Sequence, residues 1–308
     1  MINGNRFSFV FDHKPSQAEI LSAFSQQDIP TAKGTFLSCA QSYIRSKTNV
    51  LSPSTIKGYT SVLKSIPSDF KNKTISGITQ TDIQQLVNDY AADHTPKTVR
   101  NYHGFISAVL RQFRPGMNLY TTLPQNIDAD RYIPTEEDIR RILDASKNKP
   151  FYHIPFQLGV MGLRRSEICC LSLDDISGNM LTINKAIVLD VNNQWVVKTT
   201  KTAAGTRKIF IPDSLVEEIR KNGAIYDGWP NSLLSGLNSY QDKLNIPRFR
   251  FHDLRHFFAS YAHSQGMSDA DIMASGGWKS DYTMKRVYRH EMNAVESQKK
   301  LFSNLLQN

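Results

Sequence analysis

Hydrophobic residues recur every three or four positions across residues 35–118, and this period indicates helices that each bury one face. The first apolar stripe consists of Phe36, Leu37, Ala40, Tyr43 and Ile44. Three further stripes lie over residues 55–63, 82–90 and 98–113, and capping residues or prolines precede them at 52–54, 79–82 and 95–97. The pattern predicts a four-helix domain over residues 31–118.

After residue 132 the pattern changes, because helical periods now alternate with short runs of β-branched and aromatic residues. Helices are predicted over residues 134–145, 151–161, 165–171, 213–221, 253–264, 269–274 and 282–288. Strands of one small antiparallel sheet are predicted over residues 180–190, 194–199 and 207–211. The fold class expected for the chain is therefore mainly α with a small antiparallel β-sheet (α+β).

Residues 119–131 separate the two patterns, and their prolines, asparagines and aspartates with little periodicity are typical of a linker. At the start of the chain, residues 6–11 alternate like a short strand and residues 15–25 are spaced like a helix. The 308 residues are thus predicted to form a small N-terminal strand and helix element (1–30), a helical domain (31–118), the linker (119–131) and a second domain (132–308).

Basic residues outnumber acidic residues by 37 to 28, which gives a net charge of +9 with histidine neutral. The excess is even, with 13 basic and 9 acidic residues in 1–130 and 24 and 19 in 131–308. This charge favours a polyanionic partner, and nucleic acid first, that both folded domains contact. No apolar run approaches the ~20 residues of a membrane-spanning helix.

The three cysteines, Cys39, Cys169 and Cys170, cannot form a disulfide framework, and no Cys-x-x-Cys spacing suggests structural zinc. The first ten residues are too polar for an export signal. A cytoplasmic location is therefore expected.

Three basic clusters stand out in the second domain. The segment Gly162-Leu163-Arg164-Arg165-Ser166-Glu167, followed by Leu171-Ser172-Leu173-Asp174-Asp175-Ile176, resembles the first conserved box of the tyrosine recombinase (phage integrase) family. The segment His252-Asp253-Leu254-Arg255-His256 resembles the second box, and Gly276-Gly277-Trp278 with Val287-Tyr288-Arg289-His290 resembles its end. Between the boxes, Lys201-Thr202 before residues 207–212 resembles the hairpin lysine segment of the family. The resemblance spans residues 132–290 and implies a catalytic domain there, with a helical core-binding domain at 31–118.

Arg164 and Arg255 can each present a fixed fork of donors to the non-bridging oxygens of a phosphate, which a lysine does less well. His252 precedes Arg255 by three residues, so one helical face can direct an imidazole and a guanidinium toward one phosphate. The resemblance implies that both arginines bind the scissile phosphate and that His252 transfers a proton.

Tyr288 follows Trp278 by ten residues, a spacing that the family uses, and the resemblance implies that Tyr288 is the nucleophile. Tyr282 is the alternative nucleophile. Lys201 is expected to protonate the leaving 5′ oxygen, with Lys198 near the same hairpin tip as the alternative. Trp278 stands where many members have histidine; its indole can position the transition state but cannot transfer protons.

Glu167 lies on the same helical face as Arg164 and is expected to orient it rather than react. His256 is expected to be structural. The pair of His252 and His256 has a spacing compatible with metal binding, but no third ligand accompanies it. No metal and no cofactor is therefore expected.

The resemblance implies a site-specific recombinase that cleaves and rejoins double-stranded DNA as a homotetramer, through a 3′-phosphotyrosine and without metal or ATP. A non-catalytic DNA-binding relative and a type IB topoisomerase-like enzyme are the alternative functions; the joint presence of the five candidate reactive residues argues against the first. Residues 1–30 are either the remnant of an arm-binding module or a packing appendage. The apolar stripe in residues 292–306 predicts a tail helix that docks on a neighbouring subunit or folds back on its own chain.

Overall fold

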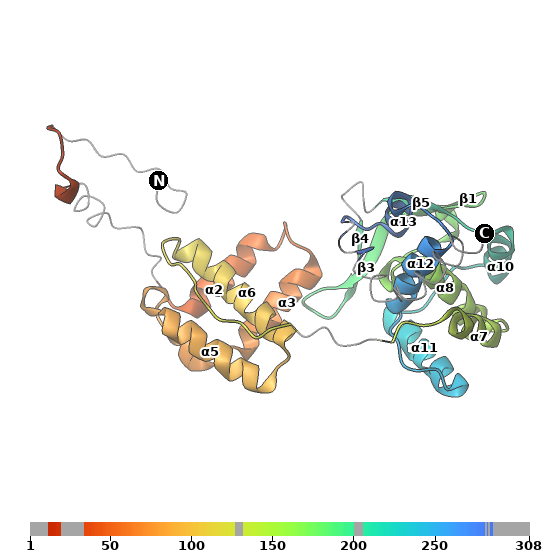
Figure 1. Ribbon diagram of the computed structural model, residues 1–308, viewed down its shortest axis with the longest axis horizontal. Helices are drawn as coiled ribbons and strands as arrows, with labels where there is room; N and C mark the ends of the chain where they lie inside the picture. The colour runs from red at the N-terminus through yellow and green to blue at the C-terminus, as the bar shows by residue number, and fades with distance from the viewer. Residues whose placement is uncertain are drawn as a thin grey trace, which may run out of the picture. The chain divides into compact units, whose positions relative to one another are not determined.

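The computed structural model describes residues 12–19, 34–126, 132–199, 206–280, 282, 284 and 285 (Figure 1). The chain divides into two compact units. The first comprises Met1–Ala129 and Leu189–Gln194, and the second comprises Asp130–Val188 and Trp195–Asn308.

The first unit contains the four predicted helices, which pack around an apolar core. They are α2 (Phe36–Lys47), α3 (Pro53–Ser65), α5 (Gln80–Asp93) and α6 (Pro96–Phe113). The sequence pattern did not predict the short helix α4 (Ser68–Asn72) or the 3-10 turn η1 (Ile75–Gly77). Helix α4 is too short for a periodic signal, yet it places Phe70 edge-on against Phe36, with ring centroids 5.1 Å apart.

Side-chain caps fix where the helices of the first unit begin. Thr79 and Asp82 form a reciprocal capping box at the start of α5, and the Thr95 hydroxyl accepts from the Thr98 amide at the start of α6. Ser52 precedes the proline that begins α3, but its side chain makes no capping hydrogen bond. The helix starts predicted at 52–54, 79–82 and 95–97 are therefore all confirmed, the first through its proline alone.

The first part of the predicted linker lies along the helices of the first unit. Residues 119–126 have no regular secondary structure. The Gln80 and Gln84 side chains accept from the amides of Tyr120 and Thr122 at 3.2 and 2.9 Å, and Arg100 donates to the Pro124 carbonyl at 2.9 Å. Residues 127–131 lie outside the described part of the chain.

The second unit is mainly helical. Its described helices are α7 (Glu136–Ser146), α8 (Pro150–Val160), α9 (Arg165–Ile168), α10 (Asp213–Asn222), α11 (Pro230–Leu244), α12 (Asp253–Ser264) and α13 (Asp269–Gly276), with the 3-10 turn η2 (Leu173–Asp175). Helix α11 was not predicted from the sequence, and the helix predicted over 165–171 is a single turn that ends at Ile168.

The strands form two small sheets instead of the single sheet that was predicted. Strands β1 (Ile176–Ser177), β2 (Met180–Ile183) and β5 (Arg207–Phe210) are antiparallel in the order β1-β2-β5, and Leu181 pairs with Ile209. Strands β3 (Lys185–Leu189) and β4 (Trp195–Thr199) pair separately. The prediction of one continuous strand over residues 180–190 is wrong, because the strand is interrupted at Asn184 and its two halves join different sheets.

The predicted class, mainly α with a small antiparallel sheet, is confirmed. The strand expected over 6–11, most of the helix over 15–25, most of the helix over 282–288 and the tail helix over 292–306 lie outside the described residues. In the part of the chain that the structure describes, no helix is both long and apolar enough to cross a membrane.

Candidate active site

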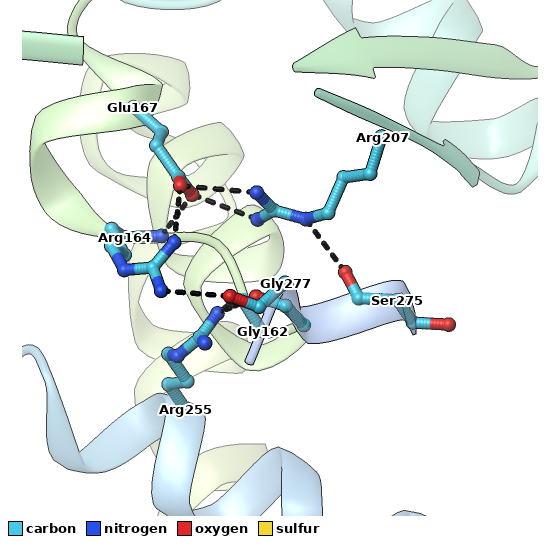
Figure 2. A network of polar contacts seen from close by, with 8 residues as sticks. Gly162, Arg164, Glu167, Arg207, Arg255, Ser275 and Gly277 are labelled. Atoms are coloured by element: carbon cyan, nitrogen blue, oxygen red, sulfur yellow. Dashed lines mark hydrogen bonds and ion pairs between the residues drawn. The ribbon is translucent and has the colours of Figure 1, made fainter. Parts of the chain in front are cut away.

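Three arginines from three different elements donate to three consecutive main-chain carbonyls at the end of α13 (Figure 2). Arg207 Nε donates to Ser275 O at 2.8 Å, Arg255 Nη1 donates to Gly276 O, and Arg164 Nη2 donates to Gly277 O at 3.0 Å. The last carbonyls of a helix have no intrahelical partner and form the negative end of its dipole, so cations bind them favourably. The end of α13 is thereby fixed at the centre of a basic cluster.

Arg164 is held at the start of α9 by Glu167. Arg164 is the N-cap residue, and its amide and Nη1 donate to the Glu167 carboxylate at 2.8 and 2.7 Å. The preceding turn needs Gly162, whose φ is +91° and where any side chain would meet the Phe258 ring. The Arg164 side chain is 38% exposed, so it is oriented by the protein and still accessible to a ligand.

Glu167 is a buried carboxylate that two arginines share. Its exposed fraction is only 2%, and Arg207 donates to its two oxygens at 3.0 and 2.8 Å. Burial by itself raises the pKa of Glu167, but the hydrogen bonds and charge of Arg207, with the charge of Arg164, lower the pKa below its ordinary value. Glu167 is therefore ionised and positions both guanidinium groups.

Arg255 is 1% exposed and still has unused hydrogen-bond donors. Its Nη1 donates to Gly162 O at 2.7 Å and to Gly276 O, whereas Nε and Nη2 have no hydrogen-bond partner among the described residues. Burial, and next the charge of Arg164, lower its pKa to about 9. A bound anion would supply acceptors for these two free donors and would add opposite charge beside the buried guanidinium.

Trp278 forms the apolar floor under this cation. The Arg255 Cζ atom lies 3.7 Å from the centre of the Trp278 ring, which stacks on Phe258 at an interplanar angle of 5°. The indole also passes directly over Gly276, where a side chain would overlap it. The packing of Trp278 on Gly276 and Phe258 therefore fixes where the Arg255 guanidinium lies.

His252 stands at the open edge of the same cluster. It is the N-cap residue of α12, only part of its surface is open to solvent, and its ring meets the His256 ring edge-on at 5.1 Å. Desolvation by the surrounding atoms, then the neighbouring His256 and Arg255, lower the pKa of His252 to about 4. The imidazole is thus neutral at pH 7 and able to accept a proton.

Family models match both units of the chain. The model described as "Phage integrase family" matches residues 134–294, and the one described as "Phage integrase, N-terminal SAM-like domain" matches residues 35–91. The first match alone covers more than half of the chain. The chain belongs to the phage integrase family.

Solved integrase structures share this fold. A structure of the Tn1549 transposon integrase with transposon right end DNA aligns with a TM-score of 0.68 and 15% identity, covering 89% of this chain and 100% of that chain. A lambda integrase dimer bound to a COC′ core site aligns with a TM-score of 0.62 and 18% identity, covering 89% and 81%. A lambda integrase tetramer bound to a Holliday junction gives 0.63 and 19%, with the same coverage. No curated protein matches the sequence.

The structure brings together five of the residues predicted for an integrase site. Arg164, Glu167 and Arg255 meet at the end of α13 with Trp278, and His252 lies close enough for the charges of both arginines to affect its pKa. His256 lies beside them, with its Nε2 atom 3.7 Å from Asp253 Oδ1.

Tyr288, the expected nucleophile, lies outside the described residues. So does Lys201, which is expected to protonate the leaving 5′ oxygen. Of their alternatives, Lys198 is exposed on β4 and Tyr282 is 67% exposed. No group of three or more His, Cys, Asp or Glu suited to a metal ion occurs within the described ranges.

Arg207 was not singled out from the sequence of this integrase. It lies on β5, where burial alternates so that Arg207 and Ile209 face inward while Lys208 and Phe210 face outward. An arginine on the inward face of a strand requires a buried partner, because a lone guanidinium is costly to bury. The two-residue period of a strand, which places Arg207 on the same face as Ile209, was therefore the sequence signal for a buried Arg207, but it does not identify Glu167 as the partner.

Proposed function

We propose that this integrase is a site-specific DNA recombinase that cleaves and rejoins strands through a 3′-phosphotyrosine intermediate, without metal or ATP. The observation that supports this most is the pair of free donors on buried Arg255, next to the accessible Arg164. Two guanidinium groups in one basic cluster suit a phosphate with two non-bridging oxygens.

In the proposed reaction, Arg164 and Arg255 bind the non-bridging oxygens of the scissile phosphate. Negative charge accumulates on these oxygens as the nucleophile attacks, so fixed cations stabilise the transition state more than the ground state. Trp278 holds Arg255 in place from below. The arginines thereby provide the charge that a metal ion provides in other phosphoryl-transfer sites.

The hydroxyl oxygen of Tyr288 attacks the phosphorus atom and the bond from phosphorus to the 5′ oxygen breaks. A phenol with a pKa near 10 is a weak nucleophile at pH 7, so neutral His252 accepts its proton. Lys201 donates a proton to the leaving 5′ oxygen. The products are a 3′-phosphotyrosine and a 5′ hydroxyl, and the reverse attack by a new 5′ hydroxyl rejoins the strand with no external energy source.

We further propose that the protein acts in the cytoplasm as a homotetramer on paired DNA sites. The lambda integrase tetramer on a Holliday junction has the same fold and supports this assembly. The apolar stripe over residues 292–306 is a candidate for the contact between subunits.

The test is the Tyr288→Phe variant on a nicked suicide substrate, which traps covalent protein–DNA adducts. Loss of the hydroxyl should abolish adducts while DNA affinity stays nearly unchanged, and the control Tyr282→Phe should form adducts normally. Wild-type adducts should also form in EDTA. Adducts that persist in Tyr288→Phe and vanish in Tyr282→Phe would reassign the nucleophile, and no adducts from the wild type would indicate a non-catalytic DNA-binding relative.

A second assay separates a recombinase from a type IB topoisomerase. Supercoil relaxation by dilute protein on DNA without a second site would favour the topoisomerase. Strand exchange that requires two matched sites would support the recombinase.

A further inference from the structure

Arg207 connects two parts of the proposed phosphate-binding cluster without being able to bind phosphate itself. Its side chain is 6% exposed, and each of its three nitrogens already donates to the protein. Nη1 and Nη2 bind the Glu167 carboxylate, and Nε binds Ser275 O at 2.8 Å (Figure 2). Arg207 therefore differs from Arg255, which has free donors.

The first connection leads to Arg164. The Glu167 carboxylate has two oxygens, and each is bound by one nitrogen of Arg207 and by one group of Arg164. If Arg207 were absent, the carboxylate would be free to rotate and to pair fully with Arg164. That change would both move the Arg164 guanidinium and neutralise more of the charge that it offers to a phosphate.

The second connection leads to Arg255 and Trp278. Arg207 holds the Ser275 carbonyl, which precedes the Gly276 carbonyl bound by Arg255 and the Gly277 carbonyl bound by Arg164. Trp278 follows directly. Fixing Ser275 thus fixes the turn against which both guanidinium groups are placed.

We propose that Arg207 is a positioning residue, which sets the orientation of Arg164 through Glu167 and of Arg255 through the carbonyls at the end of α13. This inference rests on the proposed function, because it assumes that those two arginines bind the scissile phosphate. A lysine at position 207 would keep the charge but could not bind two carboxylate oxygens and a carbonyl in one plane.

The experiment measures single-turnover cleavage at saturating DNA by the full chain with Arg207→Met, Arg207→Lys and the control Lys208→Met. Lys208 is the adjacent, outward-facing cation on β5, so its loss removes the same charge without touching the cluster. We expect the rate to fall about 10- to 100-fold in Arg207→Met and about 10-fold in Arg207→Lys, as for other residues that orient a reactive group. The DNA dissociation constant should change less than about threefold, and Lys208→Met should cleave at the wild-type rate.

A double-mutant cycle distinguishes positioning from general stabilisation. If Arg207 acts through Arg164 and Arg255, the Arg207→Lys change should lower the rate less in an Arg164→Lys background, and less in an Arg255→Lys background, than it does in the otherwise wild-type protein. Equal losses in the wild type and in both of these backgrounds would show a purely structural role and overturn the proposal. A folded Arg207→Lys protein with the wild-type rate would also overturn it, and this variant serves if Arg207→Met does not fold. The proposed function is tested separately, because adduct formation and strand exchange between matched sites are measured on the wild type alone.

Discussion

Among the described residues, the first unit has a single buried polar side chain, Ser107, whereas the second unit has seven. Those seven are Asp138, Ser146, Glu167, Arg207, Gln241, Asp253 and Arg255. The helices of the first unit meet through apolar residues such as Phe36, Ile83 and Phe105. The second unit has an apolar core of its own and, beside it, buried charges.

This difference in buried polar side chains indicates that the two interiors serve different purposes. Burial of apolar surface stabilises a fold directly, whereas a buried ion pair loses in desolvation much of what it gains in attraction. The charges of the second unit therefore have little value for stability alone. Three of them, Glu167, Arg207 and Arg255, are grouped at the end of α13, as the proposed anion site requires, and this comparison can be tested residue by residue.

The largest effect is expected for Arg255→Met. Removing one of the two cations proposed to bind the scissile phosphate should lower the single-turnover cleavage rate by about 10³-fold. The free energy of unfolding should change by less than about 1 kcal/mol, because removing a buried cation with two unpaired donors offsets the lost bonds to Gly162 and Gly276. Urea unfolding and adduct formation measure the two quantities. A loss of several kcal/mol in stability would mean that Arg255 is mainly structural, contrary to the comparison.

Glu167→Gln should destabilise the protein by about 3 kcal/mol, because it leaves the guanidinium of Arg207 buried without a counter-ion. The matched change in the first unit is Ser107→Ala, which removes a hydroxyl next to His103 and should alter stability by less than about 1 kcal/mol. Thermal unfolding monitored by circular dichroism compares them. Equal effects would remove the proposed contrast between the two interiors.

A capping box that occurs in both units gives a smaller and better matched comparison. Asp82 accepts from the Thr79 amide at 2.9 Å and is partly exposed. Asp138 accepts from the Thr135 amide at 2.9 Å, also accepts from the Tyr132 hydroxyl, and is buried. We expect Asp138→Ala to lower the free energy of unfolding by about 2 kcal/mol and Asp82→Ala by about 1 kcal/mol.

Both capping carboxylates have pKa values below the ordinary one. Hydrogen bonds from Thr79 and Lys73 lower the pKa of Asp82; at Asp138, burial raises the pKa but the bonds from Tyr132 and Thr135 outweigh it. Their contribution to stability is therefore present above the pKa of the unfolded chain, near 3.9, and is lost as the pH falls through the lower folded value. The difference between the two alanine variants should shrink at low pH, and a difference that grows there would refute this account.

The smallest effect concerns the titration of His252. Its folded pKa of about 4 lies below the ordinary value near 6.5, so the unfolded chain binds more protons than the folded chain between those values. His252 thus lowers stability as the pH falls from about 6.5 to about 4. In the free protein, the imidazole resonance that disappears in His252→Gln should show no protonation step between about pH 7.5 and 5. A midpoint near 6.5 would contradict the lowered pKa of His252.

Long periodic helices such as α6 were predictable from the sequence, because eighteen residues repeat the same apolar spacing. Helix α11 was missed because its serines, asparagines and Gly236 are typical of loops, and the glycine is needed for a contact that the sequence does not reveal. The Tyr152 ring lies where a side chain at position 236 would project. The break at Asn184 was missed for a similar reason, since only the pairing partners of β2 and β3 separate the two strands.

The site was predictable where its members are close in sequence. The contact of Arg164 with Glu167 follows from a spacing of three residues and is present at 2.7 Å. The partnership of Glu167 with Arg207 spans forty residues, from α9 to β5 with η2 and strands β1 to β4 between them, so no local pattern predicts it. The burial of Arg255 likewise depends on the distant end of α13, so the sequence did not predict it. The choice of Arg255 as a phosphate-binding candidate needed only the local sequence around it.

The close passage of Trp278 over Gly276 has a consequence for how relatives of this chain can vary. A methyl group at position 276 would overlap the indole, so the two positions cannot change independently. A smaller ring at 278, such as histidine, would leave room for alanine at 276, whereas alanine beside tryptophan would displace the ring that lies under Arg255. Among homologous sequences, glycine at the first position should therefore be obligatory wherever the second is tryptophan and relaxed where it is histidine, a correlation that sequencing alone can measure.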